Sequence, residues 1–127
     1  MALTILLIDD HPLVARAIRM LCRPHTVEHF GAADVALPAA LAGAHDLIFC
    51  DLDLPGGGAP AFYDPLLAAA PEKAARVFFV SGAPDGSGGY ESFVRRVGRP
   101  ILDKADLNRA LPAVIASVLA GVGSARG

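Results

Sequence analysis

The sequence lacks three features that would assign it to a specialised class of protein. Its 127 residues include no apolar run that approaches the roughly 20 residues of a membrane span, and no basic stretch leads into an apolar segment near Met1 as in a signal peptide. Lys and Arg are scattered, and the net charge is −2. We therefore expect a cytoplasmic chain with no membrane contact and no direct nucleic-acid binding, because phosphate binding needs clustered cations.

Cysteine is also scarce. The two cysteines, Cys22 and Cys50, each lie in an apolar pattern, which predicts buried reduced thiols rather than a disulfide or a metal pair. The histidines do not have the spacing of metal ligands, so we interpret all of them as structural. They are His11, His25, His29 and His45.

Short apolar runs are abundant, and 54% of the residues are apolar. The clearest run spans 47–50 and leads straight into Asp51, after which a proline and three glycines follow by position 58. A short apolar run bounded by turn residues is typical of a strand buried on both faces. Similar runs predict further strands over 4–8, 26–30, 77–80 and 100–102.

Helical patterns separate these strands. Apolar residues repeat at helical spacing over 13–22 and 107–119, and we expect further helices after Asp34 as a cap, over 62–70 and over 90–97. Pro65 leaves open a shorter helix that starts at that proline. Pro112 leaves open a start near Asn108 or a kinked helix from Leu107.

Five strands alternating with helices predict an α/β fold, a doubly wound five-stranded parallel sheet of the flavodoxin-like type with strand order 2-1-3-4-5. We expect one domain over residues 1–120. The glycine-containing segment 121–127 is predicted to be a tail or the start of a linker.

In this strand order, the carboxyl ends of four strands meet at one edge of the sheet, where open α/β sheets bind their ligands. The residues delivered there are Asp9, Asp10, Asp51, Ser81 and Lys104. Crowded carboxylates repel one another unless a cation lies between them, and Mg²⁺ prefers carboxylates, a carbonyl and waters as ligands. We therefore expect a magnesium site at Asp9, Asp10 and Asp51, with the carbonyl of Asp53 as a further ligand.

Phosphoryl transfer to a carboxylate needs a nucleophile, a metal and neutralising donors. Asp51 is the natural nucleophile, and the Ser81 hydroxyl and the Lys104 ammonium are the donors. Each residue alone has a plainer interpretation, such as a helix N-terminal acid pair, a turn serine or a surface lysine. The coincidence of all five positions at strand ends favours a functional site.

These five positions, each at a strand end and in this order, resemble a response-regulator receiver domain of two-component signalling. The segments Ile-Leu-Leu-Ile-Asp-Asp-His-Pro-Leu-Val and Leu-Asp-Lys-Ala-Asp resemble the branch that precedes LuxR-type helix-turn-helix outputs. The resemblance implies that Asp51 accepts a phosphoryl group from a sensor histidine kinase. It also implies that Asp9 and Asp10 hold Mg²⁺ and that Ser81 and Lys104 contact the phosphoryl oxygens.

The same resemblance implies a phosphorelay protein that regulates transcription, rather than an enzyme, and leaves homodimerisation open. Receivers usually carry an aromatic switch residue three positions before the lysine, where this chain has Ile101. The loop 83–89, with three glycines, is also unusual. We therefore expect the surface of helix 90–97, strand 100–102 and helix 107–119 to switch through this loop.

Two alternatives stay open. A receiver-like adaptor that acts by protein contacts without phosphorylation is favoured by Ile101 and the loop 83–89, while the complete acid, serine and lysine set argues against it. Asp51-Leu52-Asp53 also resembles the first motif of haloacid-dehalogenase-like phosphatases. That family, however, expects a further acidic pair after the lysine, whereas Asp9-Asp10 precede the nucleophile.

Overall fold

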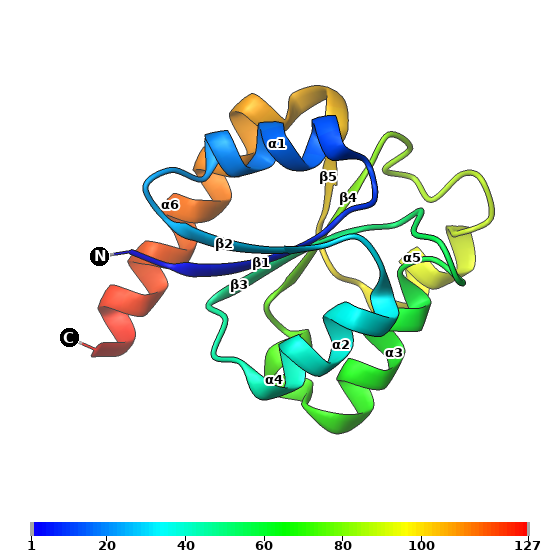
Figure 1. Ribbon diagram of the computed structural model, residues 1–127, viewed down its shortest axis with the longest axis horizontal. Coiled ribbons are helices and arrows are strands. Elements are labelled where there is room, and N and C mark those ends of the chain that lie inside the picture. Colours follow the sequence, from blue (N-terminus) through cyan, green and yellow to red (C-terminus); the bar gives the residue numbers. More distant parts are fainter. Residues whose placement is uncertain (1, 127) are drawn as a thin grey trace.

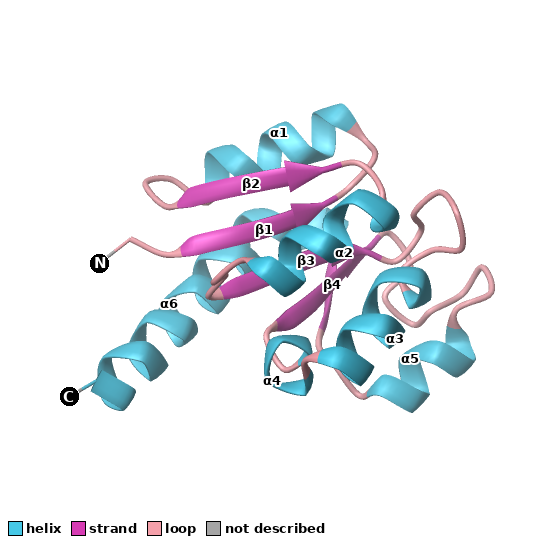
Figure 2. Ribbon diagram, turned by 60° about the horizontal axis from the view of Figure 1, so that its bottom comes forward, coloured by secondary structure: helices cyan, strands magenta, loops and turns pink. Residues whose placement is uncertain are grey.

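The computed structural model describes residues 2–126 and contains a five-stranded sheet in the order β2-β1-β3-β4-β5. Figure 2 shows β2, β1, β3 and β4 side by side in this order. Every neighbouring pair of strands is parallel. The predicted strand order is confirmed. The strands are β1 (Thr4–Ile8), β2 (Thr26–Phe30), β3 (Leu47–Asp51), β4 (Val77–Ser81) and β5 (Ile101–Asp103).

Helices cover both faces of this sheet, as a doubly wound fold requires (Figure 1). One face carries α1 (Pro12–Leu21) and α6 (Leu107–Arg126). The other face carries α2 (Ala33–Ala42), α3 (Pro60–Ala69), α4 (Pro71–Ala74) and α5 (Glu91–Val97). A 3-10 turn, η1 (Lys104–Asp106), joins β5 to α6. Within residues 2–126, no helix is long and apolar enough to cross a membrane.

The central strands contribute to two apolar clusters at once. Along β1, Leu6 and Ile8 pack with the helices of one face, while Ile5 and Leu7 pack with α1 and α6 on the other. All four side chains are completely buried. Successive side chains of a strand point to opposite faces, so a strand covered on both sides reads as a continuous apolar run.

The two cysteines follow the same division. Cys50 lies in the cluster beneath α2 and α3, and Cys22 lies in the cluster beneath α1 and α6. Both are buried free thiols, as predicted.

The helix after β2 begins differently from the prediction. Ala32 is the N-cap of α2, and no side chain caps it, so the prediction that Asp34 is the cap is wrong. Asp34 instead lies in the first turn, where its charge favours the positive end of the helix dipole.

Prolines interrupt the helices less than expected. Pro65 lies inside α3, which already begins at Pro60, so the shorter helix starting at Pro65 is not formed. Pro112 lies inside α6, which begins at Leu107. Burial of an apolar helix face outweighs the single backbone hydrogen bond that each proline removes.

The helix α6 continues to Arg126, through the segment that was predicted to be a tail or the start of a linker, and that interpretation stays a prediction. The predicted boundary of the domain near residue 120 stays a prediction. The strand expected at 100–102 is shifted by one residue to β5, and the short helix α4 was not predicted.

Candidate functional site

The carboxyl ends of β1, β3, β4 and β5 lie along one edge of the sheet, and the predicted site residues come together there. Strand pairing aligns Asp51 with Val80 and Ser81 with Asp103. The five residues are Asp9 and Asp10 after β1, Asp51 at the end of β3, Ser81 at the end of β4, and Lys104 after β5.

Lys104 lies between two buried carboxylates. Its ammonium nitrogen is 3.3 Å from Oδ2 of Asp51 and 4.0 Å from Oδ2 of Asp9. The side chains of Asp51 and Asp9 are 2% and 1% exposed, whereas that of Lys104 is 21% exposed. A buried carboxylate is costly without a cation or hydrogen-bond donors, and the single positive charge of Lys104 offsets only part of the negative charge of the two acids.

The remaining oxygen of Asp51 is held by the loop that follows β3. The backbone N–H of Asp53 donates to Oδ1 of Asp51 over 3.2 Å. Burial raises the pKa of Asp51, and the negative charge of Asp9 raises this pKa further, while the Asp53 amide and Lys104 oppose the change. Asp51 is therefore a desolvated, basic carboxylate whose environment favours added positive charge.

The acid pair after β1 consists of Asp9 and Asp10, and each has a carboxylate oxygen that could bind a cation. Oδ1 of Asp9 accepts the backbone N–H of His11 over 2.8 Å. Oδ2 of Asp9 and Oδ1 of Asp10 are buried and accept no hydrogen bond from the residues whose side chains the structure describes. The Lys104 ammonium lies 4.0 Å from the first oxygen, and Nδ1 of His11 lies 3.5 Å from the second. Buried carboxylate oxygens that lack a hydrogen bond are suitable ligands for a hard divalent cation such as Mg²⁺, so the acid pair fits the predicted metal.

His11 lies beside this acid pair, which the interpretation of all histidines as structural did not anticipate. One atom each from Asp9, Asp10 and His11 lie within 4.8 Å of one another. The His11 side chain is exposed, and Mg²⁺ prefers oxygen to imidazole nitrogen. The adjacency of His11 to Asp9-Asp10 was the signal available in the sequence.

A pocket of about 390 Å³ opens beside Asp51. Ser81 and Lys104 line it, together with His11 and Tyr90. Oγ of Ser81 accepts the backbone N–H of Ala83 over 2.9 Å, which leaves the hydroxyl hydrogen available for another acceptor. The pocket therefore offers an ammonium and a hydroxyl to an oxygen-rich group on Asp51.

Tyr90 is a member of this pocket that the sequence did not indicate. Its hydroxyl donates to Oδ1 of Asp53 over 3.3 Å. Its ring lies so close to Gly58 that a Cβ at this position would overlap the ring. Tyr90 thus joins the loop after β3 to the loop before α5. No periodic pattern in the sequence predicts a contact between these two loops.

Comparison with solved structures finds proteins of the same architecture, whereas comparison by sequence finds no match. Neither a protein-family model nor a curated protein sequence matches the chain. A CheY-like response regulator receiver domain from Methylobacillus flagellatus matches with a TM-score of 0.76 and 22% identity, over 93% of this chain and 99% of that chain. The signal receiver domain of an HD domain-containing protein from Pseudomonas fluorescens Pf-5 matches with a TM-score of 0.78 and 19% identity, over 98% and 99%.

A third match is the receiver domain of a sensor histidine kinase from Pseudomonas aeruginosa PAO1, described with a magnesium ion coordinated in its active site cleft. Its TM-score is 0.73 at 19% identity, over 91% of this chain and 99% of that chain. The chain therefore has the fold of CheY-like response-regulator receiver domains. The resemblance to the branch with LuxR-type outputs stays a prediction.

Proposed function

We propose that this chain is a phosphoacceptor receiver and that Asp51 takes a phosphoryl group from a phosphohistidine of a sensor histidine kinase. One observation carries the proposal: a buried carboxylate at a strand end, beside a pocket, has Lys104 3.3 Å away. The receiver fold supports the same function, because one matching structure is the receiver domain of DrrB activated with beryllofluoride.

In the proposed transfer, an oxygen of Asp51 forms a bond to phosphorus while the bond from phosphorus to the donor imidazole breaks. The electron pair of that bond leaves with the imidazole, and the product is an acyl phosphate. Lys104 releases Oδ2 of Asp51 and donates to a phosphoryl oxygen, and the Ser81 hydroxyl donates to another. Both hydrogen bonds are charge-assisted and exist only in the phosphorylated state.

Magnesium would be held by Asp9, Asp10 and Asp51, with the carbonyl of Asp53 as a further ligand. The support is the pair of buried oxygens, on Asp9 and Asp10, that accept no hydrogen bond in the described part of the chain. When bound, the ion supplies positive charge that neutralises the phosphoryl oxygens. The magnesium in the cleft of the Pseudomonas aeruginosa receiver supports this assignment.

The phosphoryl signal would reach the surface of α5, β5 and α6 through the loop before α5, and from there would control transcription. Ser81 is hydrogen-bonded to the start of this loop through Ala83, and Tyr90 at its end is hydrogen-bonded to Asp53. Movement of Ser81 toward a phosphoryl group pulls on one end, while Tyr90 holds the other. Ile101 has no polar group with which to contact the site. Tyr90 is the aromatic residue suited to respond to phosphorylation, because its hydroxyl already bonds Asp53.

The test is intact-mass measurement after incubation with acetyl phosphate and Mg²⁺. Wild type and the control Asp85→Asn, which changes an exposed loop carboxylate, should both gain one phosphoryl group. Asp51→Asn should gain none. An equal adduct on Asp51→Asn would refute the assignment, and no adduct on folded wild type would favour the adaptor that acts without phosphorylation.

A further inference from the structure

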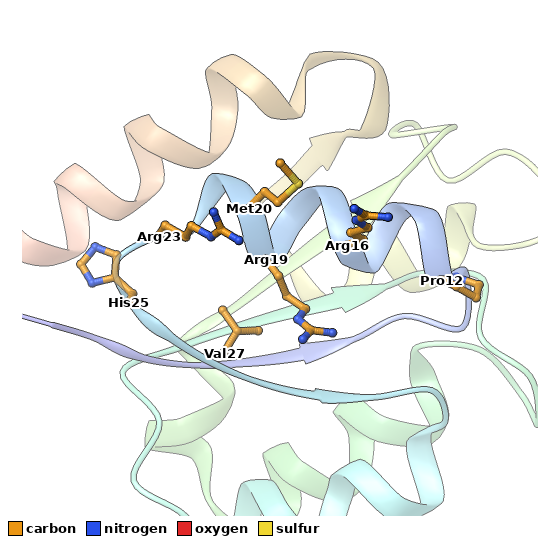
Figure 3. Close-up of a pocket in the computed structure, with 7 residues that line it drawn as sticks. All are labelled: Pro12, Arg16, Arg19, Met20, Arg23, His25 and Val27. Carbon is orange, nitrogen blue, oxygen red and sulfur yellow. The ribbon is translucent and has the colours of Figure 1, made fainter.

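A second hollow, of about 630 Å³, lies between α1 and the outer strand β2, away from Asp51 (Figure 3). Arg16 and Arg19 of α1 and Arg23 just after it line one wall. Val27 of β2 lines the other. Ala15 and Ile18 of α1 are buried in the core, whereas Arg16, Arg19 and Arg23 are exposed where they line the hollow.

The three arginines have no carboxylate partner among the residues whose side chains the structure describes. Most other cationic side chains there do have an acceptor. Lys73 and Arg76 donate to backbone carbonyls, and Arg96 pairs with Asp64. The row Arg16, Arg19 and Arg23 is therefore a local excess of positive charge on a chain of net charge −2.

A free sheet edge borders the same hollow. The N–H of Thr26 donates to the carbonyl of Leu3, and the carbonyl of Phe30 accepts the N–H of Asp9, both over 3.0 Å, so these residues of β2 face β1. Backbone groups alternate along a strand, so those of Val27 and His29 face the opposite edge. No strand within residues 2–126 lies on that side, because β2 ends the sheet order.

We propose that this groove binds an extended acidic segment of a partner protein, which adds to β2 as a further strand. Its backbone would pair with Val27 and His29, and its carboxylates would meet the arginine row. Alternate side chains of an extended segment lie about 7 Å apart on one side, within reach of long arginine side chains. A small phosphorylated ligand fits less well, because all three arginines are exposed residues and do not enclose an anion.

The proposal is tested by nuclear magnetic resonance on the full ¹⁵N-labelled chain, with a short acetylated peptide that alternates Glu and Val as the probe. Amide shifts should concentrate at Val27 and His29. The triple variant Arg16→Gln, Arg19→Gln and Arg23→Gln should bind about tenfold more weakly, since several exposed charge pairs are lost. Arg95→Gln, which removes an exposed arginine on α5, should bind like wild type.

Val27→Pro separates strand addition from simple charge attraction. The N–H of Val27 faces outward, so proline removes a donor for the peptide without removing a bond to β1. Binding should fall severalfold in this variant. The proposal is overturned if the triple glutamine variant binds the peptide as wild type does. It is also overturned if Val27→Pro is folded and binds normally, or if inorganic tripolyphosphate gives the same shifts and displaces the peptide.

Discussion

The ammonium nitrogen of Lys104 lies 3.3 Å from Oδ2 of Asp51, although 53 positions separate the two residues in the sequence. The strand order makes this contact, because β3 and β5 flank β4 and end at the same edge of the sheet. Burial alone would disfavour the charge on Asp51, and Lys104 partly restores it. The pair is thus both a structural element and the centre of the proposed chemistry.

Replacing Lys104 with Gln should slow phosphorylation of Asp51 by acetyl phosphate at least tenfold, because the variant loses a charged donor to the transferring group. The initial rate of adduct formation by intact mass measures this effect. Arg109→Gln is the matched control, since it removes an exposed cation that pairs with Asp106 in the turn before α6. If Lys104→Gln and Arg109→Gln form the adduct at the same rate, Lys104 does not assist phosphorylation of Asp51.

Asp10→Asn should weaken Mg²⁺ binding about tenfold or more, because it removes a hard oxygen ligand. Isothermal titration with Mg²⁺ measures the affinity, and Asp34→Asn in the first turn of α2 is the control. His11→Ala should bind Mg²⁺ as wild type does, since the imidazole is not expected to be a ligand. A loss in His11→Ala with none in Asp10→Asn would reverse the assignment.

The raised pKa of Asp51 predicts a pH-dependent cost to stability. The folded state holds the proton more tightly than the unfolded state, in which the pKa lies near its ordinary value of 3.8. The contribution of Asp51 to the free energy of unfolding is therefore fully present below that value and is lost as pH rises through the higher folded pKa. Asp51→Asn does not ionise, so it should be more stable than wild type at pH 7 by about 1 kcal/mol.

Urea unfolding of wild type and Asp51→Asn at acidic and neutral pH measures this difference. The stability advantage of the variant should shrink as the pH falls toward 4. An advantage that grows on acidification would mean that the folded protein lowers the pKa of Asp51 rather than raising it.

Tyr90→Phe keeps the ring against Gly58 and removes the hydroxyl that bonds Asp53. Hydrogen exchange over residues 83–97 should become faster in the absence of phosphate, because the loop loses its hydrogen bond to the site. The change produced by beryllofluoride in the same segment should shrink. Tyr63→Phe, which alters a tyrosine of the core, is the control, and a beryllofluoride response confined to α1 would contradict the proposed route.

The strand ends were predictable because each central strand is covered on both faces and reads as a continuous apolar run. Once the order 2-1-3-4-5 is inferred, Asp9, Asp51, Ser81 and Lys104 must approach one edge. Their proximity does not establish their roles in phosphoryl transfer, and these roles stay proposals.

The contacts of loops and helix ends were not predictable in the same way. Tyr90 meets Asp53 and Gly58 only because two loops fold toward each other, and no periodicity in the sequence encodes that approach. Asp34 and Pro65 were misread for a related reason. Local propensity favours a helix cap at Asp34 and a helix break at Pro65. The apolar faces of α2 and α3 are buried against the sheet, however, and this packing decides where the two helices begin.

The most direct test of the central claim is to locate the phosphoryl group itself. After acetyl phosphate and Mg²⁺ treatment, borohydride reduces an aspartyl phosphate to homoserine, and tandem mass spectrometry of the digest identifies the residue changed. Phosphorylation of Asp51 predicts homoserine at position 51 of the wild type and at no other carboxylate of the site. Homoserine at position 9, 10 or 53, or a folded protein with none, would mean that Asp51 is not the phosphoacceptor.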